Sequence, residues 1–223
     1  MNQSQKTMKL VMAGVLTAII IIMAFVPYLG YIPLGVINAT IIHVPVIIGA
    51  ILLGPRYGAF FGLVFGITSL IKNTINPNLT SFVFSPFYSA GEFSGNFCSL
   101  IICLVPRILI GVVAYYVFQL VMAICRQIAG KEKKTHHISQ IVSLAIAGVA
   151  GSMTNTLLVM NLIYRFFGSE YAAATGKAYE TLYSAILAII VGSGIPEAIV
   201  AGILTCIITK VLFQVVRLNG IRK

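Results

Sequence analysis

The stretch IIHVPVIIGAILLGPRYGAFFGLVFGITSLI, residues 41–71, decides the fold class of this chain. It holds two apolar runs separated only by the short turn GPRYG, in which Arg56 is the charged residue. A bilayer core about 30 Å thick needs about 20 apolar residues of helix to cross it. We therefore expect two membrane spans here, over residues 35–54 and 57–74, joined by a tight turn.

The composition extends this interpretation to the whole chain. Of its 223 residues, 59% are hydrophobic and only 9% are charged, which is more apolar surface than a soluble domain can bury. Four more runs are long enough to span, over residues 8–26, 104–125, 138–162 and 195–216. No polar stretch is longer than a loop. The sequence therefore predicts an all-α integral membrane protein of six transmembrane helices, a single membrane domain over residues 1–223.

The basic residues predict the orientation of the chain. If the amino terminus is cytoplasmic, eleven of the fifteen Lys and Arg residues lie inside: Lys6, Lys9, Arg56, Arg126, Lys131, Lys133, Lys134, Lys210, Arg217, Arg222 and Lys223. The four outside are Lys72, Arg107, Arg165 and Lys177. The positive-inside rule then places both termini in the cytoplasm. The net charge of +10 reflects cytoplasmic loops in this interpretation and does not indicate nucleic-acid binding.

Two outer connections are long, between the third and fourth spans and between the fifth and sixth. Each has roughly thirty residues rich in aromatic residues, glycine and serine. Loops of this length within a compact protein are often lids over a binding site. We therefore expect long capping loops on the extracellular side.

Two apolar runs carry a proline followed by an ionisable residue, LVPRILIGVVAYY (104–116) and SGIPEAIVAGIL (193–204). Proline fits the first turn of a helix, so we expect Arg107 and Glu197 at helix N-termini. The helix dipole favours an anion there and disfavours a cation, so Arg107 needs an anionic partner. Three partners are open: Glu197 in a salt bridge between two helices, Glu92, and a bound anionic solute.

Other polar residues lie near the outer ends of the spans. Lys72 and Asn73 close the third span, where a second cationic contact and a snorkelling lysine are both open. In the fifth span, small and polar residues recur every four positions: Ser139, Ser143, Ala147, Gly151 and Asn155. The small ones favour close helix packing. Asn155, Asn161 and Tyr164 lie further out and are candidates for hydrogen bonds to a ligand.

Catalytic and metal-binding motifs are missing from the sequence. It has no P-loop, no HExxH, no CxxC and no GxSxG with a plausible base, so we expect neither catalysis nor nucleotide hydrolysis by this chain. It also lacks an evident inverted repeat, which many secondary transporters have. The pattern favours a binding subunit that takes its energy from another protein. An intramembrane enzyme using His43 or Glu197 and a standalone channel or permease are the alternatives.

Four segments together resemble the substrate-binding S-components of energy-coupling factor (ECF) vitamin transporters: residues 41–71, VPRILIGVVA (105–114), GSMTNTLLVM (151–160) and IPEAIVAGILT (195–205). The resemblance covers nearly the whole chain and is strongest to the pantothenate-specific branch. It implies a six-helix subunit of a prokaryotic cell membrane that binds a vitamin outside and topples in the membrane to deliver it. The implied partners are a transmembrane coupling protein and two ATPase subunits, which bind ATP and magnesium, with no cofactor in this chain.

The resemblance also implies roles for particular residues. The family contacts the coupling protein through an AxxxA motif on its first helix, which appears here as Gly14-xxx-Ala18, small at both positions but without the first alanine. Pantothenate has a carboxylate, an amide and two hydroxyls, which suit a cation with amide and hydroxyl side chains. The candidate substrate-binding residues are Lys72, Asn73, Arg107, Asn155, Asn161, Tyr164 and Glu197. S-components for folate, pyridoxine or riboflavin are the alternatives within the family.

Overall fold

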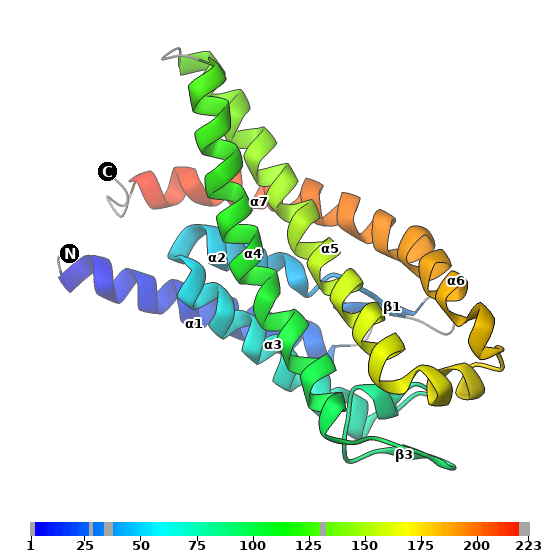
Figure 1. Cartoon of the computed structure of the whole chain (residues 1–223). Coiled ribbons are helices and arrows are strands. Elements are labelled where there is room, and N and C mark those ends of the chain that lie inside the picture. Colours follow the sequence, from blue (N-terminus) through cyan, green and yellow to red (C-terminus); the bar gives the residue numbers. More distant parts are fainter. Residues whose placement is uncertain (1–2, 27–28, 34–37, 130–132, 219–223) are drawn as a thin grey trace.

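Long helices dominate the structure, as the apolar runs predict (Figure 1). The computed structural model describes residues 3–26, 29–33, 38–129 and 133–218. Its helices are α1 (Gln3–Phe25), α2 (His43–Leu53), α3 (Pro55–Ile75), α4 (Phe97–Ala129), α5 (Lys133–Ala174), α6 (Tyr179–Ile189) and α7 (Ile195–Leu218). Two short antiparallel pairs join them, β1 (Tyr31–Pro33) with β2 (Asn38–Thr40) and β3 (Ser89–Ala90) with β4 (Phe93–Ser94).

Five helical segments of the described chain are long and apolar enough to cross a membrane: Gln5–Phe25, Pro55–Ile75, Phe97–Ile128, His137–Ala174 and Tyr179–Gln214. Their outward faces remain apolar. On α7, for example, Ile195, Ile199, Ile203 and Ile207 are all exposed at four-residue intervals. Such a stripe needs lipid around it, so the chain is a multi-pass membrane protein.

The second predicted span is shorter than we expected. We predicted a helix over residues 35–54, but α2 covers His43–Leu53 only, about 17 Å at 1.5 Å per residue. Residues 38–40 form β2, and residues 34–37 lie outside the described part of the chain. All residues of α2 except Leu52 are buried, in contact with α1, α3, α4, α5 and α7. The helix is apolar because protein surrounds it, and its composition alone does not reveal its length.

Glycines bring α3 and α4 into backbone contact. Gly58, Gly62 and Gly66 are spaced by four residues and lie on the face of α3 toward α4. A Cβ on Gly58 would lie 3.0 Å from the backbone of Gly111, and a Cβ on Gly62 would overlap the carbonyl oxygen of Arg107. Small residues at this spacing allow such close approach in membrane bundles. The α3–α4 contact therefore fixes the part of α4 that carries Arg107.

The predicted small face of the fifth span is a packing face. Ser139, Ser143, Ala147, Gly151 and Asn155 are all buried on α5. Gly151 makes room for the side chain of Ile47 on α2, since a Cβ there would lie 2.7 Å from it. The packing interpretation of this face is confirmed for Ser143, Ala147 and Gly151.

The two connections that were predicted to be long loops differ from one another. The first is a loop with a 3-10 turn at Ser81–Val83 and the β3–β4 hairpin, but it is shorter than predicted because α4 begins at Phe97. The second was predicted to be a long loop, and this is wrong: α5 kinks at Phe167 but stays helical beyond it to Ala174, and α6 begins at Tyr179. Its aromatic residues pack in helices, because Phe167 and Tyr171 of α5 share a buried cluster with Leu182 of α6. The β1–β2 hairpin is a further cap that the sequence did not reveal.

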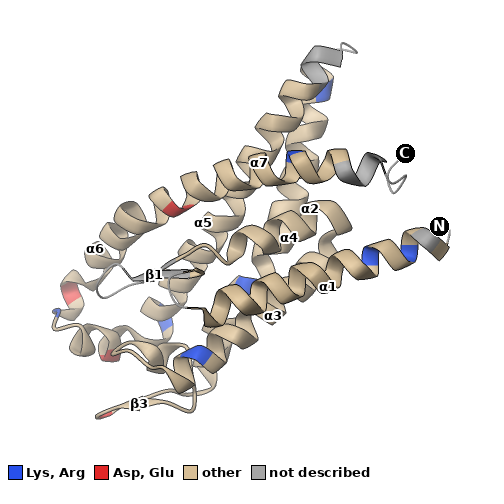
Figure 2. Ribbon diagram, turned by 180° about the vertical axis from the view of Figure 1, so that it is seen from behind, with Lys and Arg blue, Asp and Glu red and all other residues tan. Residues whose placement is uncertain are grey.

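The two chain ends lie at the same end of the bundle, in agreement with an even number of crossings (Figure 1). At the opposite end lie β3, α6 and the turn between α5 and α6. The acidic residues of the described chain lie toward this end as well (Figure 2). The sides of the membrane on which the two ends lie stay a prediction.

Candidate functional site

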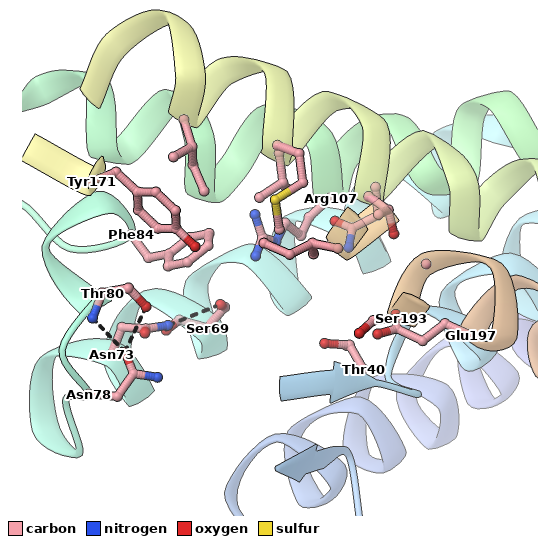
Figure 3. A pocket seen from close by; sticks show the side chains of 17 residues that line it. Thr40, Ser69, Asn73, Asn78, Thr80, Phe84, Arg107, Tyr171, Ser193 and Glu197 are labelled. Atoms are coloured by element: carbon pink, nitrogen blue, oxygen red, sulfur yellow. Dashed lines mark hydrogen bonds between the residues drawn. The ribbon is translucent and has the colours of Figure 1, made fainter. Parts of the chain in front are cut away.

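A cavity opens at the end of the bundle away from the termini, between α3, α4, α5, α7 and strand β2 (Figure 3). Its empty volume is about 820 Å³ with its open mouth included. The polar residues that line it are Thr40, Ser69, Asn73, Asn78, Thr80, Arg107, Asn155, Thr156, Tyr171, Ser193 and Glu197. The rest of the lining is Phe84, Val159, Met160, Ile163, Ile189 and Gly194.

Pro106 explains how the cation of this site is held. We predicted a helix N-terminus here, but α4 begins at Phe97, so Pro106 lies inside the helix. Proline has no amide hydrogen, and the carbonyl of Ile102, four residues earlier, therefore loses its helical donor. Nη1 of Arg107 donates a hydrogen bond to that carbonyl at 2.7 Å. Pro106 thus leaves the Ile102 carbonyl free to accept a hydrogen bond. The Arg107 side chain donates this bond, which fixes the direction of the guanidinium.

Arg107 is buried among aromatic rings. Its side chain is 7% exposed, and its guanidinium carbon lies 5.1 Å from the ring centre of Phe84 and 5.7 Å from that of Phe65. Nε is buried without a hydrogen-bond partner. Among the described side chains no acidic group forms an ion pair with it, so the salt bridge to Glu197 that the sequence left open is not formed. A buried cation without an anion is costly, and the arrangement favours an anionic ligand.

A hydrogen-bond network holds the loop between α3 and α4 against α3. The hydroxyl of Ser81 lies 2.8 Å from Oδ1 of Asn73 and 2.9 Å from Oδ1 of Asn78. Nδ2 of Asn73 donates to the carbonyl of Ser69 at 2.8 Å, and the Thr80 amide donates to Oδ1 of Asn78 at 3.2 Å. Figure 3 shows this polar group along one side of the cavity. It gives that side a fixed set of amide and hydroxyl groups.

The middle of α5 supplies polar atoms that lack partners. Asn155 is 9% exposed, and its Oδ1 is buried without a hydrogen bond. The hydroxyl of Ser152, one turn earlier, is also buried without a hydrogen-bond partner. Buried polar groups are nearly always paired, so an unpaired amide oxygen on a residue that lines a cavity indicates a ligand contact.

Glu197 lies at the other side of the cavity, on α7. We predicted it at a helix N-terminus, but α6 continues through a π turn, Ile190–Gly194, directly into α7. Pro196 has no amide to donate to this turn, which accounts for the break in the regular helical hydrogen bonding. The Glu197 carboxylate faces the backbone amide of Thr40, and Figure 3 shows it beside Ser193 and Thr40.

Four of the seven predicted ligand residues line this cavity: Asn73, Arg107, Asn155 and Glu197. The other three do not. Lys72 lies on α3 outside the lining, and Asn161 is exposed, with Nδ2 bonded to the carbonyl of Leu157 at 2.7 Å. The Tyr164 ring stacks on Tyr179 of α6, with ring centres 6.0 Å apart, and so ties α5 to α6.

Several lining residues were missed by the sequence interpretation. Thr40 belongs to β2, Asn78 and Thr80 to the loop between α3 and α4, and Tyr171 to the last turns of α5. No short motif marks them, because the cavity combines segments that are far apart in the sequence. The exception is Ser193, which precedes the noted Pro196 and Glu197 by only a few residues.

Gly14 and Ala18 lie on an exposed face of α1. A Cβ on Gly14 would meet no atom within 4 Å. Beside this face, α1, α2 and α7 form a groove lined only by apolar residues such as Val15, Ile19 and Ile208. The pair is thus available to another protein and makes no contact that the isolated chain needs.

Comparisons with known proteins identify a family and two relatives. Residues 8–209 match the family described as "ECF transporter, substrate-specific component". The pantothenic acid transporter PanT of Lactococcus lactis subsp. cremoris is 35% identical over 170 residues, 73% of this chain and 78% of the relative. The pantothenate transporter PanT of Leuconostoc mesenteroides subsp. mesenteroides is 29% identical over 224 residues, 98% of each chain.

Proposed function

The chain belongs to the ECF transporter family of substrate-specific components, and from this premise we propose that it binds pantothenate in the cavity around Arg107. One observation carries the proposal: a buried guanidinium, held in place by the carbonyl of Ile102, faces a small-molecule cavity with no acidic partner among the described residues. The names of the two relatives support pantothenate as the substrate.

The cavity chemistry suits this vitamin. A charge-assisted bond from Arg107 to the carboxylate is the strong contact. Asn73 and Asn155 supply amide groups for the amide and hydroxyls of the ligand. Arg107 is the only Lys or Arg among the described lining residues, which suits one carboxylate. Folate has two carboxylates and pyridoxine has none, so both fit less well.

We assign no ligand contact to Lys72, Asn161 and Tyr164, since they lie outside the lining. The family implies the remaining steps. The chain captures the vitamin at the outer face of a prokaryotic cell membrane and docks on a transmembrane coupling protein through Gly14 and Ala18. It then topples to release its ligand when two ATPase subunits hydrolyse ATP with magnesium. The exposed small face of α1 supports this docking mode.

Equilibrium binding of radiolabelled pantothenate to the purified chain tests the proposal. We expect tight, saturable binding that needs no ATP. Replacing Arg107 with alanine should weaken it by about 10- to 100-fold, because a hydrogen-bonded charge contact is lost. Thermal unfolding of the variant shows whether it is folded.

Three results would contradict the proposal. A folded Arg107→Ala protein with unchanged affinity would make the guanidinium structural. Conversion of the ligand would indicate an enzyme, and uptake into liposomes without any ATPase partner would indicate a standalone permease.

A further inference from the structure

The side of the cavity around Glu197 has a chemistry that a carboxylate ligand on Arg107 does not explain. Glu197 is half-buried, and among the described residues no Lys, Arg or His forms an ion pair with it. The hydroxyl-bearing residues Thr40 and Ser193 lie beside it and line the same space (Figure 3). An acidic group among hydroxyls is a good acceptor for ligand O–H groups and a poor neighbour for an anion.

A second cavity, the side cavity, adjoins this region. It shares Thr40, Ser193 and Glu197 with the main cavity and has an empty volume of about 510 Å³ with its mouth included. Beyond this polar rim, its walls are mostly apolar, with Val44 and Ala201 among them. The two cavities therefore adjoin at Thr40, Ser193 and Glu197, and the second one suits a branched apolar group.

His43 adds an independent observation. It lines the side cavity, is 1% exposed, and neither of its ring nitrogens has a hydrogen-bond partner. In the described part of the structure, His43 forms no hydrogen bond to another helix. A buried imidazole in this condition favours a ligand hydroxyl, which can serve either nitrogen as donor or acceptor.

We propose that Glu197 and His43, with Thr40 and Ser193, form a second half of the site that recognises an uncharged, hydroxyl-bearing, branched end of the ligand and excludes its phosphorylated form. The inference rests on the proposed function. In pantothenate, the end away from the carboxylate has two hydroxyls flanking a carbon with two methyl groups. With the carboxylate on Arg107, the hydroxyls reach Glu197 and His43, and the methyl groups enter the side cavity.

The exclusion follows from the charges. A phosphate on the terminal hydroxyl adds a second anion to a ligand whose first anion already occupies Arg107. No other Lys or Arg lines the main cavity in the described chain, and the second anion would face the Glu197 carboxylate. Like charges at such a contact are strongly unfavourable.

Competition binding with two unlabelled ligands tests the inference, pantothenate and pantothenate phosphorylated on its terminal hydroxyl. The wild-type chain should prefer the unphosphorylated ligand by at least about 100-fold. Glu197→Gln keeps the size of the side chain but removes its charge. This variant should bind pantothenate about tenfold more weakly, and its preference for pantothenate over the phosphorylated ligand should fall by about tenfold or more. His43→Phe should weaken pantothenate binding without narrowing the preference. Glu180→Gln, at an exposed position on α6, is the matched control and should change neither value.

The outcomes separate this inference from the proposed function. If the wild type binds pantothenate and Glu197→Gln keeps the full preference, the inference is wrong and the function stands. If the wild type does not bind pantothenate at all, the proposed function and this inference are both wrong. A narrowed preference in Glu197→Gln, with Glu180→Gln unchanged, supports both.

Discussion

At the scale of single residues, the pairing of Pro106 with Arg107 shows how a membrane protein can hold a cation without an anion. The proline removes one helical donor, and the guanidinium replaces it on the carbonyl of Ile102. One arm of the guanidinium is thus bound to the protein. The guanidinium therefore lines the cavity in a fixed position before any ligand arrives, which lowers the entropic cost of binding.

Replacing Pro106 with alanine tests this coupling. The new amide can bond the Ile102 carbonyl as in a regular helix, and it then competes with Nη1 of Arg107. We expect the variant to fold at least as stably as the wild type, since interior prolines disfavour helices. We also expect pantothenate affinity to fall by about three- to tenfold, because the guanidinium loses its fixed position.

Two measurements check this outcome, isothermal titration of the ligand and thermal unfolding of the empty protein. A stable variant with wild-type affinity would show that the bond to Ile102 does not orient the cation.

The ionisable and amide residues of the site were the easier ones to predict. Arg107, Glu197 and Asn155 stand out because polar groups in apolar spans need a partner or a function. Residues in loops, such as Asn78 and Thr80, carry no such signal, since polar side chains are ordinary there. The position of Tyr164 made it a candidate for a ligand hydrogen bond, but its ring stacks on Tyr179. Nothing in the local sequence indicates that contact.

At the scale of helices, the glycine stripe of α3 connects packing to the site. Gly62 contacts the backbone of Arg107, so the separation of α3 and α4 also sets the position of the cation. The four-residue spacing of Gly58, Gly62 and Gly66 is visible in the sequence, but the sequence interpretation did not use it. The partner helix is not visible, because many helices present small residues.

Gly62→Ala should therefore damage both stability and binding. Its methyl group would overlap the Arg107 carbonyl, and overpacking of this kind costs about 1–3 kcal/mol of stability. Thermal unfolding in detergent measures the loss, and ligand titration should show weaker pantothenate binding as α4 shifts.

Gly14→Ala is the matched control: its methyl group meets no atom within 4 Å, so stability should stay equal or rise by up to about 1 kcal/mol. Equal stability of both variants would argue against close α3–α4 packing.

The limits of predicting whole elements are clearest in α2 and in the α6–α7 segment. An apolar run predicts burial in lipid or in protein, and α2 shows that the two cannot be told apart by composition when a short helix is fully enclosed. Around Pro196 the usual rule starts a helix at the proline. Here the π turn Ile190–Gly194 precedes the proline and accommodates its missing amide hydrogen, so the helix continues.

At the scale of the whole molecule, the proposed ligand cavity and the proposed docking face lie on different parts of the bundle. The cavity is lined by α3, α4, α5, α7, β2 and the loop after α3. The Gly14 and Ala18 pair lies on the outward face of α1, and neither residue lines the cavity. Changes to the face of α1 should therefore leave ligand binding intact and affect only the assembly with a partner.

Ala18→Leu tests this separation. The larger side chain extends into open surroundings on an exposed face, so the isolated chain should fold and bind pantothenate with wild-type affinity. Close approach of a partner helix requires small residues, and uptake by the reconstituted complex with its coupling protein and ATPases should fall by about tenfold or more. Ala123→Leu makes the same change at an exposed position on α4 and should leave uptake unchanged. If both variants transport normally, α1 does not dock through this face. If Ala18→Leu also loses ligand affinity, the exposed face of α1 and the cavity are coupled within the bundle itself. Toppling would then have to be explained by a conformational change transmitted through α1 and not by docking on its surface.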